Sequence, residues 1–146
     1  TTPGIETWCK ANPGATLYGA IYGNVQQLRY GVNAVRFAAF DAFRPMSRNS
    51  EPDAMEPDYR FDRTGWMTWV YLVESCEAVA VPTVPVLYVG PILDDVERFA
   101  EGPSVIPGAN HMREGCCVRP VTERWDDRVG RVHLKVIGNG YLETAA

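Results

Sequence analysis

The chain has 146 residues, a mass of 16.2 kDa and a formal net charge of -4 at pH 7. Hydrophobic residues make up 46% and charged residues 22%, which is typical of a globular domain and excludes a disordered or collagen-like chain. The acidic balance argues against nonspecific binding to a nucleic-acid backbone, although it leaves a local basic face open.

The sequence shows no targeting or membrane segment. No apolar stretch reaches the roughly 18 residues that a membrane-spanning helix requires. The first residues, TTPGIETW, lack the basic start and apolar run of a signal peptide. We therefore expect a cytoplasmic protein with no membrane partner. The start at Thr1 instead of Met suggests processing, trimming or missing upstream sequence.

Hydrophobic periodicity and turn residues predict five strands and two helices. In chain order, the elements are strands over 15–23 and 35–43, a helix over 67–79, a strand over 84–90, a helix over 93–100, and strands over 114–121 and 131–137. Residues 44–65 are rich in Pro, Asp, Ser and charge, which predicts a loop or insertion. The order of elements predicts one α+β domain over 1–146 with a mostly antiparallel sheet.

The cysteines and histidines favour no metal site. Cys9, Cys76, Cys116 and Cys117 include no CxxC spacing, so reduced cysteines in the core are favoured over a zinc site. His111 and His133 are 22 residues apart, with no further ligand pattern nearby. We therefore expect neither histidine to bind metal.

Three sequence blocks stand in an order and at distances that resemble a known family. The first is LYGAIYGNVQQLRYG at 17–31 with its continuation RFAAFD at 36–41, the second is REGCCVRP at 113–120, and the third is VHLKVIGNGYLE at 132–143. They are similar to the third, fourth and fifth motifs of the nucleotidyltransferase domain of ATP-dependent RNA ligases, particularly the nick-sealing type and its bacterial and phage relatives. The resemblance covers the chain from about residue 15 onward. It implies a truncated ATP-grasp-like RNA or DNA ligase domain that lacks its N-terminal part.

The resemblance assigns roles to individual residues. It implies that Phe40 stacks on adenine, that Lys135 contacts the α-phosphate of ATP, and that Glu114 holds Mg²⁺. Arg119 stands at the basic end of the fourth motif, and Gln26 matches a family glutamine after the turn. The chemistry agrees, because bases stack on aromatic rings, cations bind phosphate, and Mg²⁺ prefers oxygen ligands.

Each assignment has a structural alternative. Phe40 could be an ordinary core residue, and Glu114 a solvated carboxylate paired with Arg113 or Arg119. A surface ion pair is the alternative for Arg119. A loop-stabilising amide is the alternative for Gln26.

Three departures from the family pattern bear on the mechanism. The family begins its reaction with a lysine in a K-x-D-G motif, and this sequence has no such motif. Its only lysines are Lys10, at the wrong spacing, and Lys135, which belongs to the fifth motif. Ala20 stands where the family has a ribose-binding Glu, and Ile137 replaces a second basic residue. Covalent catalysis requires an activated nucleophile, which this chain alone lacks.

Two hypotheses follow, and a third is weaker. In the first, the chain is a pseudoenzyme that sequesters an adenine nucleotide or binds an RNA end without adenylating itself. In the second, it is the downstream part of an active ligase that joins RNA 3'-OH and 5'-phosphate ends, with its nucleophile on an upstream half. In the third, the fold persists only as a structural or interaction module. An exposed sheet edge would favour a homo-oligomer.

Overall fold

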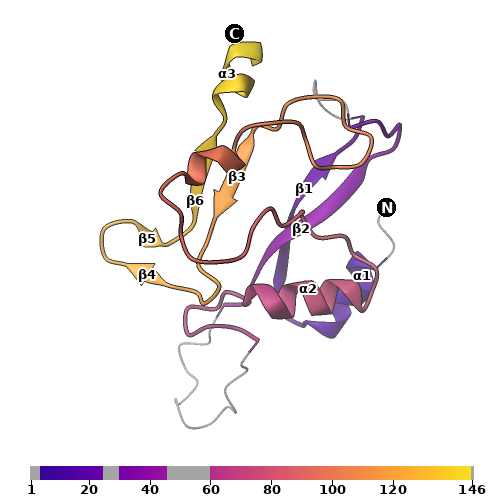
Figure 1. Ribbon diagram of the computed structural model, residues 1–146. Coiled ribbons are helices and arrows are strands. Elements are labelled where there is room, and N and C mark those ends of the chain that lie inside the picture. The colour runs from indigo at the N-terminus through magenta and orange to yellow at the C-terminus, as the bar shows by residue number, and fades with distance from the viewer. Residues whose placement is uncertain (1–3, 25–29, 46–59, 146) are drawn as a thin grey trace. The chain divides into compact units, whose positions relative to one another are not determined.

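The computed structural model describes residues 4–24, 30–45 and 60–145 (Figure 1). The chain divides into two compact units. Unit 1 comprises Thr1–Ile21, Arg36–Val84 and Val121–Glu123, and unit 2 comprises Tyr22–Val35, Pro85–Pro120 and Arg124–Ala146.

Unit 1 is built on two helices and a strand pair. Its elements are α1 (Ile5–Ala11), β1 (Thr16–Tyr22), β2 (Arg36–Phe43) and α2 (Trp69–Glu77). β1 pairs with β2, and Gly19 lies against Ala38 whereas Gly23 lies against Ala34, so the two strands run antiparallel. These strands confirm the expectation for 15–23 and 35–43, and α2 confirms the helix expected over 67–79.

The core of unit 1 lies between α1, α2 and β2. Its buried residues are Trp8, Ala39, Ala42, Phe61, Met67, Leu72, Cys76 and Val81. Leu72 and Cys76 are four residues apart on α2 and therefore share one helix face. Trp8 is fully buried, and its indole Nε1 donates a hydrogen bond of 2.9 Å to the Ser75 hydroxyl. The sequence reading missed α1, because a helix of seven residues is too short to show a clear period.

The expected loop over 44–65 contributes to this core at its C-terminal end. Residues 46–59 lie outside the described part of the chain. Beyond them, Phe61 is buried and bridges Met67. Asp62 Oδ1 accepts hydrogen bonds from the backbone N–H groups of Thr64 and Trp66 at 2.9 and 2.8 Å. A side-chain-stabilised turn therefore carries the chain from this segment toward α2.

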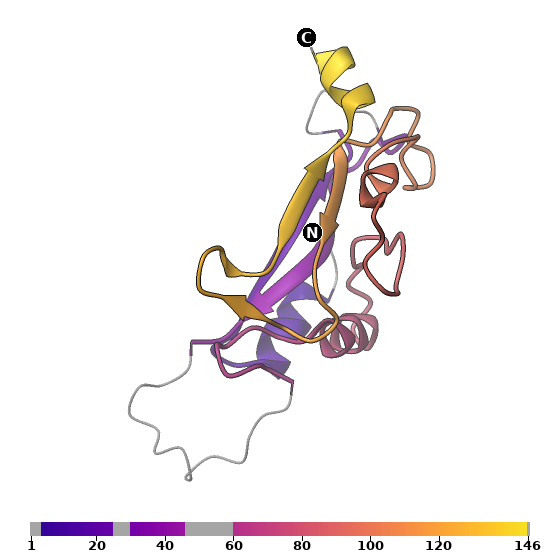
Figure 2. The same cartoon turned by 60° about the vertical axis from the view of Figure 1, so that its left-hand side comes forward.

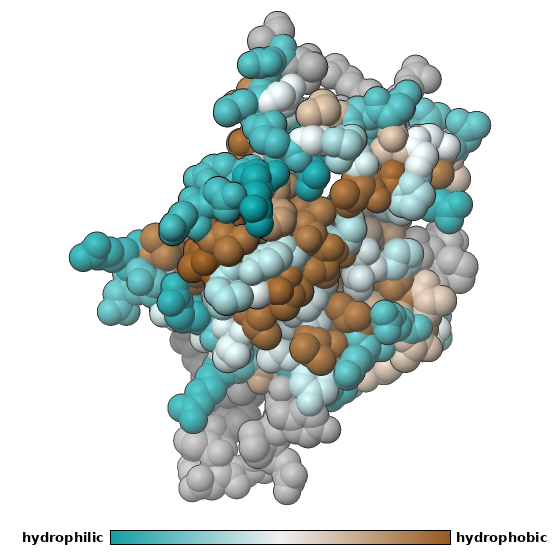
Figure 3. All heavy atoms as spheres, in the orientation of Figure 1, coloured by the Kyte–Doolittle hydropathy of each residue, from teal (hydrophilic) through white to brown (hydrophobic). Residues whose placement is uncertain are grey.

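The strand expected over 84–90 is wrong. Thr83 makes an isolated parallel bridge to Ala39, and residues 84–90 form no strand. Pro82, Pro85 and Pro91 have no backbone N–H, so they cannot donate to a ladder. Apolar side chains from this segment remain on the surface, with Val89 70% exposed. In Figure 3, hydrophobic residues are visible at the surface among hydrophilic ones.

Unit 2 contains two short antiparallel strand pairs. Its elements are the 3-10 helix η1 (Val96–Phe99), strands β3 (Gly115–Val118), β4 (Trp125–Asp126), β5 (Gly130–Arg131) and β6 (Leu134–Ile137), and α3 (Asn139–Ala145). β3 pairs with β6, and β4 pairs with β5. The strands expected over 114–121 and 131–137 are present but shorter, and the helix expected over 93–100 is only η1. The structure therefore confirms an α+β chain with short antiparallel sheets.

The expectation that all four cysteines lie in the core is wrong. All four are free, but only Cys76 is buried. Cys116 is half-buried, whereas Cys9 and Cys117 are exposed. Cys116 and Cys117 are neighbours on β3, where successive side chains alternate between faces. Within the described ranges, no helix is long and apolar enough to cross a membrane.

Replacing Trp8 by Ala should strongly destabilise unit 1, because the substitution leaves a cavity and removes the bond to Ser75. We expect a loss of about 3–5 kcal/mol in the free energy of unfolding, measured by urea denaturation. Cys9→Ala, at an exposed position on the same helix, is the control and should stay within about 0.5 kcal/mol of the wild type. Equal stability of Trp8→Ala and Cys9→Ala would contradict this account of the core.

Candidate functional site

The candidate site is built on the β3–β6 ladder of unit 2. In this ladder Gly115 lies opposite Ile137, and Cys117 lies opposite Lys135. A Cβ at Gly115 would lie 2.0 Å from the Val136 carbonyl oxygen, far inside van der Waals contact. Only glycine therefore allows the two backbones to approach this closely. The close approach of β3 and β6 thus explains why the REGCCVRP block has glycine at position 115.

The close ladder brings two of the predicted site residues together. Gly138 N donates a 2.9 Å hydrogen bond to the Glu114 carbonyl oxygen, which fixes Glu114 beside the end of β6. The Lys135 ammonium forms a salt bridge with the Glu114 carboxylate. About half of each side chain is exposed, at 53% for Lys135 and 47% for Glu114. The ion-pair partner of Glu114 is thus Lys135.

Electrostatics keep Lys135 charged. The hydrogen bond to Glu114 is the main reason that the pKa of Lys135 is raised above its ordinary value, and the Glu114 charge adds to the effect. A raised lysine pKa means that the ammonium persists through neutral pH and is lost only in strongly alkaline solution. At neutral pH the site therefore presents an ammonium group beside a carboxylate.

Two tyrosines complete this group. The pKa of Tyr30 is raised by burial first and then by the charge of Glu114 and the proximity of Tyr141. Tyr141 also acts on the pKa of Lys135. We call Tyr30, Glu114, Lys135 and Tyr141 the Lys135 cluster. Sequence reasoning missed both tyrosines as site residues, although each lies inside a motif block, at 17–31 and 132–143.

Unit 2 holds these aromatic residues through backbone and side-chain contacts. Glu101 accepts hydrogen bonds from Asn139 N at 2.6 Å and Gly140 N at 3.3 Å, so it caps the first turn of α3, which carries Tyr141. The Tyr30 ring meets the His111 ring edge to face, with centroids 4.6 Å apart. The contacts that position the two tyrosines therefore come from residues distant in the sequence. His111 contacts Tyr30, and Glu101 caps the helix that carries Tyr141.

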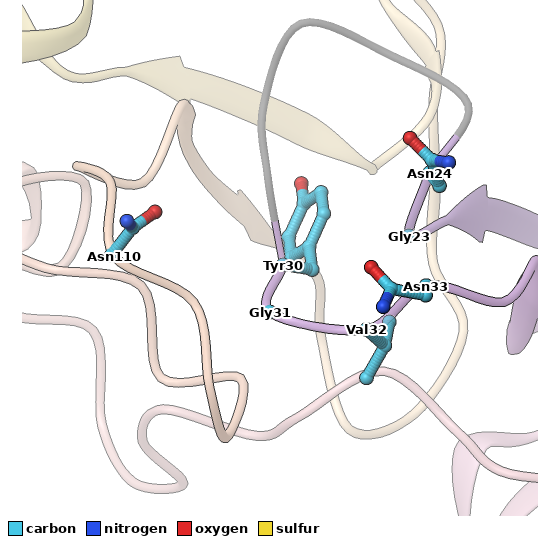
Figure 4. Close-up of a pocket in the computed structure, with 7 residues that line it drawn as sticks. All are labelled: Gly23, Asn24, Tyr30, Gly31, Val32, Asn33 and Asn110. Carbon is cyan, nitrogen blue, oxygen red and sulfur yellow. The ribbon is translucent and has the colours of Figure 1, made fainter.

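A hollow of about 210 Å³ adjoins Tyr30 (Figure 4). Its lining consists of Gly23, Asn24, Tyr30, Gly31, Val32, Asn33 and Asn110. The three asparagine amides carry donors and acceptors, and Tyr30 offers an aromatic ring. Small-molecule pockets usually measure about 300–1,000 Å³, so this hollow has room for only part of a nucleotide.

The other predicted site residues are distributed over both units. In unit 1, Phe40 lies on β2 with 36% of its surface exposed and is not among the buried core residues. Ala20 lies exposed on β1 of the same unit. In unit 2, Arg119 follows β3 and is half-buried. Gln26 lies outside the described residues.

The described residues offer no ready-made metal centre. In residues 4–24, 30–45 and 60–145, no group of three or more His, Cys, Asp or Glu side chains could hold a metal ion. His111 packs on Tyr30, and its Nδ1 lies 2.8 Å from the Met112 carbonyl oxygen. Glu114 remains one carboxylate, which fits an Mg²⁺ ion whose other ligands are water and phosphate oxygens.

Replacing Glu114 by Gln should lower the pKa of Lys135, because the charged hydrogen-bond acceptor is lost. The chain has only two lysines, so ¹³C-lysine NMR gives two side-chain signals, and Lys10→Arg assigns them. We expect the Lys135 signal to titrate at lower pH in Glu114→Gln than in the wild type. Glu97→Gln, at an exposed position in η1, is the matched control. An unchanged Lys135 titration in Glu114→Gln would rule out the salt bridge.

Comparison with known proteins agrees with the motif blocks. No curated protein and no solved structure matches the chain. The family model described as RNA ligase matches residues 4–137, which include both strands of the β3–β6 ladder and three residues of the Lys135 cluster, Tyr30, Glu114 and Lys135. Because this match extends over most of the sequence, the chain belongs to the RNA ligase family.

Proposed function

We propose that this chain is an RNA-ligase-like nucleotide-binding protein with a nucleotidyltransferase-type core, which binds an adenine nucleotide without adenylating itself. The observation that carries the proposal is the Lys135–Glu114 salt bridge on the β3–β6 ladder. It places a permanent cation beside a carboxylate, in a chain that belongs to a family of nucleotide-using proteins. The pair suits a phosphate group and a metal ion that accompanies it.

Lys135 is suited to bind phosphate and poorly suited to attack it. A lysine nucleophile needs a neutral amine, which proteins obtain by burial or by a neighbouring cation. Lys135 has the opposite surroundings, because a carboxylate raises its pKa and half of its side chain faces solvent. Its charge-assisted contact with a phosphate oxygen would replace or share its contact with Glu114.

Lys10 is equally unsuited as a nucleophile. It lies on α1 and pairs with Glu6 one helical turn away, with Nζ 2.6 Å from Oε1. Its side chain is 75% exposed. The surroundings of both lysines support the proposal that the chain binds a nucleotide without adenylating itself.

An aromatic ring in unit 1 and asparagine amides in unit 2 are further proposed ligands of an adenine nucleotide. The partial exposure of Phe40 supports a stacking role better than a core role, since 36% of its surface is open. The asparagine amides around the hollow beside Tyr30 offer hydrogen bonds to a base or ribose edge. Arg119 and Gln26 remain proposed ligands. Ala20 has no side-chain hydrogen-bonding group, so the family's contact to ribose at that position is absent.

A magnesium ion would share the phosphate site. Mg²⁺ is usually bound by one or two carboxylates together with phosphates and water, so Glu114 would hold the ion and Lys135 would contact the phosphate. The ion would neutralise phosphate charge when bound. Because Glu114 already accepts a hydrogen bond from Lys135, we expect the ion to join this site together with the nucleotide.

Replacing Lys135 by Ala should weaken ATP binding by about 10- to 150-fold, since a charge-assisted hydrogen bond contributes about 1.5–3 kcal/mol. Isothermal titration calorimetry with ATP and Mg²⁺ measures the change. Lys10→Ala removes the other lysine and is the matched control, with expected wild-type affinity. Phe40→Ala, measured in parallel, tests the stacking role at a position outside the charged pair.

The absence of saturable ATP binding by the wild-type chain would reject the proposal. Equal affinities for Lys135→Ala and Lys10→Ala would remove Lys135 from the site. Normal binding by a folded Phe40→Ala variant would remove Phe40.

The alternative proposal is that the chain is the downstream part of an active RNA ligase. The RNA ligase family model supports this alternative, because it matches residues 4–137. In that case a lysine from a K-x-D-G segment would supply the nucleophile, and this chain would supply Lys135, Glu114 and Phe40. Adding a separately produced K-x-D-G-bearing chain should then produce a lysyl-adenylate from labelled ATP. Failure of the two chains to form it together would count against this alternative.

A further inference from the structure

The first turn of α3 contains the one Asn-Gly dipeptide of the 146-residue sequence, at Asn139 and Gly140. This dipeptide lies inside the VHLKVIGNGYLE block, but nucleotide binding gives it no role. Asn139 is exposed to solvent, whereas Gly138, which precedes it, is buried. Figures 1 and 2 show α3 directly beyond the end of β6 in unit 2. The dipeptide thus lies where the strand ends and the helix begins.

An asparagine that precedes a glycine can react with its own backbone. The Gly140 nitrogen attacks the side-chain Cγ of Asn139, and a new C–N bond closes a five-membered imide. The C–N bond of the Asn139 amide breaks, and its nitrogen leaves as ammonia with the proton from Gly140 N. Water then opens the imide at either carbonyl, which gives aspartate or isoaspartate. Glycine favours this reaction because no side chain obstructs the attack.

The helical backbone opposes this reaction. In an α-helix the backbone ψ is about -42°, and this conformation keeps Cγ of Asn139 away from the next backbone nitrogen. The imide therefore forms only when the first turn of α3 opens locally. A helix of seven residues is not stable by itself, so contacts from outside α3 decide how often it opens.

The Glu101 carboxylate holds the first turn of α3 closed. Its Oε1 accepts a 2.6 Å hydrogen bond from Asn139 N, and its Oε2 accepts one of 3.3 Å from Gly140 N. The segment that carries Glu101 can approach because residue 138 is a glycine, where a Cβ would lie 2.6 Å from the Ala100 carbonyl oxygen.

The same carboxylate also opposes the chemical step. The attacking nitrogen of Gly140 must lose its proton, and Glu101 accepts a hydrogen bond from that N–H group. A nearby negative charge disfavours a group that becomes negatively charged. Glu101 therefore restrains the reaction both through the backbone conformation and through charge.

We propose that Asn139 is a deamidation site that the Glu101 carboxylate restrains, and that its conversion releases the first turn of α3. Conversion adds a carboxylate to the residue whose backbone N–H Glu101 binds, so like charges come close together. Isoaspartate also adds a methylene to the main chain, so Glu101 no longer accepts from both N–H groups. Because α3 carries Tyr141, the change occurs beside the Lys135 cluster. This inference does not rest on nucleotide binding.

Incubation of the chain at mildly alkaline pH, followed by peptide mapping with mass spectrometry, tests the proposed site. Asn139 should deamidate ahead of Asn33 and Asn110, which are exposed but precede residues with side chains. Glu101→Ala should accelerate the reaction at Asn139 by about 2- to 30-fold, the change expected from loss of a helix cap. Glu97→Ala, which removes an exposed carboxylate in η1, is the matched control and should react as the wild type.

Glu101→Gln keeps the shape of the side chain but removes its charge, so it should also react faster than the wild type. Circular dichroism checks that each variant is folded, and Glu101→Gln serves as the test if Glu101→Ala does not fold. Equal rates at Asn139 in the folded Glu101 variant and in Glu97→Ala would overturn the proposal. A rate at Asn139 no higher than at Asn33 and Asn110 in the wild type would also overturn it.

Two further measurements test the mechanism and its consequence. Gly140→Ala should slow deamidation, because its Cβ obstructs the attack while lying 3.4 Å from Glu101 Oε2 and Met112 Cε, which are ordinary contacts. The deamidated chain gains a negative charge and can be isolated by ion exchange. Its α3 amides should exchange hydrogen faster than those of the unreacted chain. Unchanged exchange, or an equal rate of deamidation in Gly140→Ala and the wild type, would contradict the proposal.

Discussion

The close pairing of β3 with β6 is the constraint on which the candidate site depends. Gly115 lets the β3 backbone pass the Val136 carbonyl at a distance that no Cβ would permit. That approach sets the register in which Lys135 lies opposite Cys117, and it holds the Glu114 carbonyl on Gly138 N. Two oppositely charged side chains, Glu114 and Lys135, therefore meet across a ladder of only four residue pairs.

The charge state of that pair decides what the site can do. Glu114 raises the pKa of Lys135, so the lysine stays an ammonium ion at neutral pH. An ammonium ion binds phosphate but does not attack it. The pair is half exposed, so its contribution to stability is small and its value lies in the chemistry of the site. The same environment that suits Lys135 to the proposed phosphate contact makes it a poor nucleophile.

Local sequence patterns predict several strands and helices and two of the site residues. The remaining features of the fold and the site depend on contacts between residues that are distant in the sequence. The strand pair β1–β2 and helix α2 follow from periodicity, and the motif blocks located Glu114 and Lys135. Their mutual salt bridge could not be predicted, because residues 21 positions apart meet only through the strand register. The strand expected over 84–90 was wrong because three prolines outweighed its β-branched composition. Helix α1 is explained by the burial of Trp8, which no local pattern revealed.

Intact-mass spectrometry of the chain incubated with ATP and Mg²⁺ tests the central claim most directly. The claim is that the Lys135 cluster binds an adenine nucleotide without forming a bond to it. The account predicts an unchanged covalent mass under denaturing conditions, together with a bound nucleotide in native spectra of the same sample. A covalent AMP adduct on Lys135 or Lys10 would contradict it.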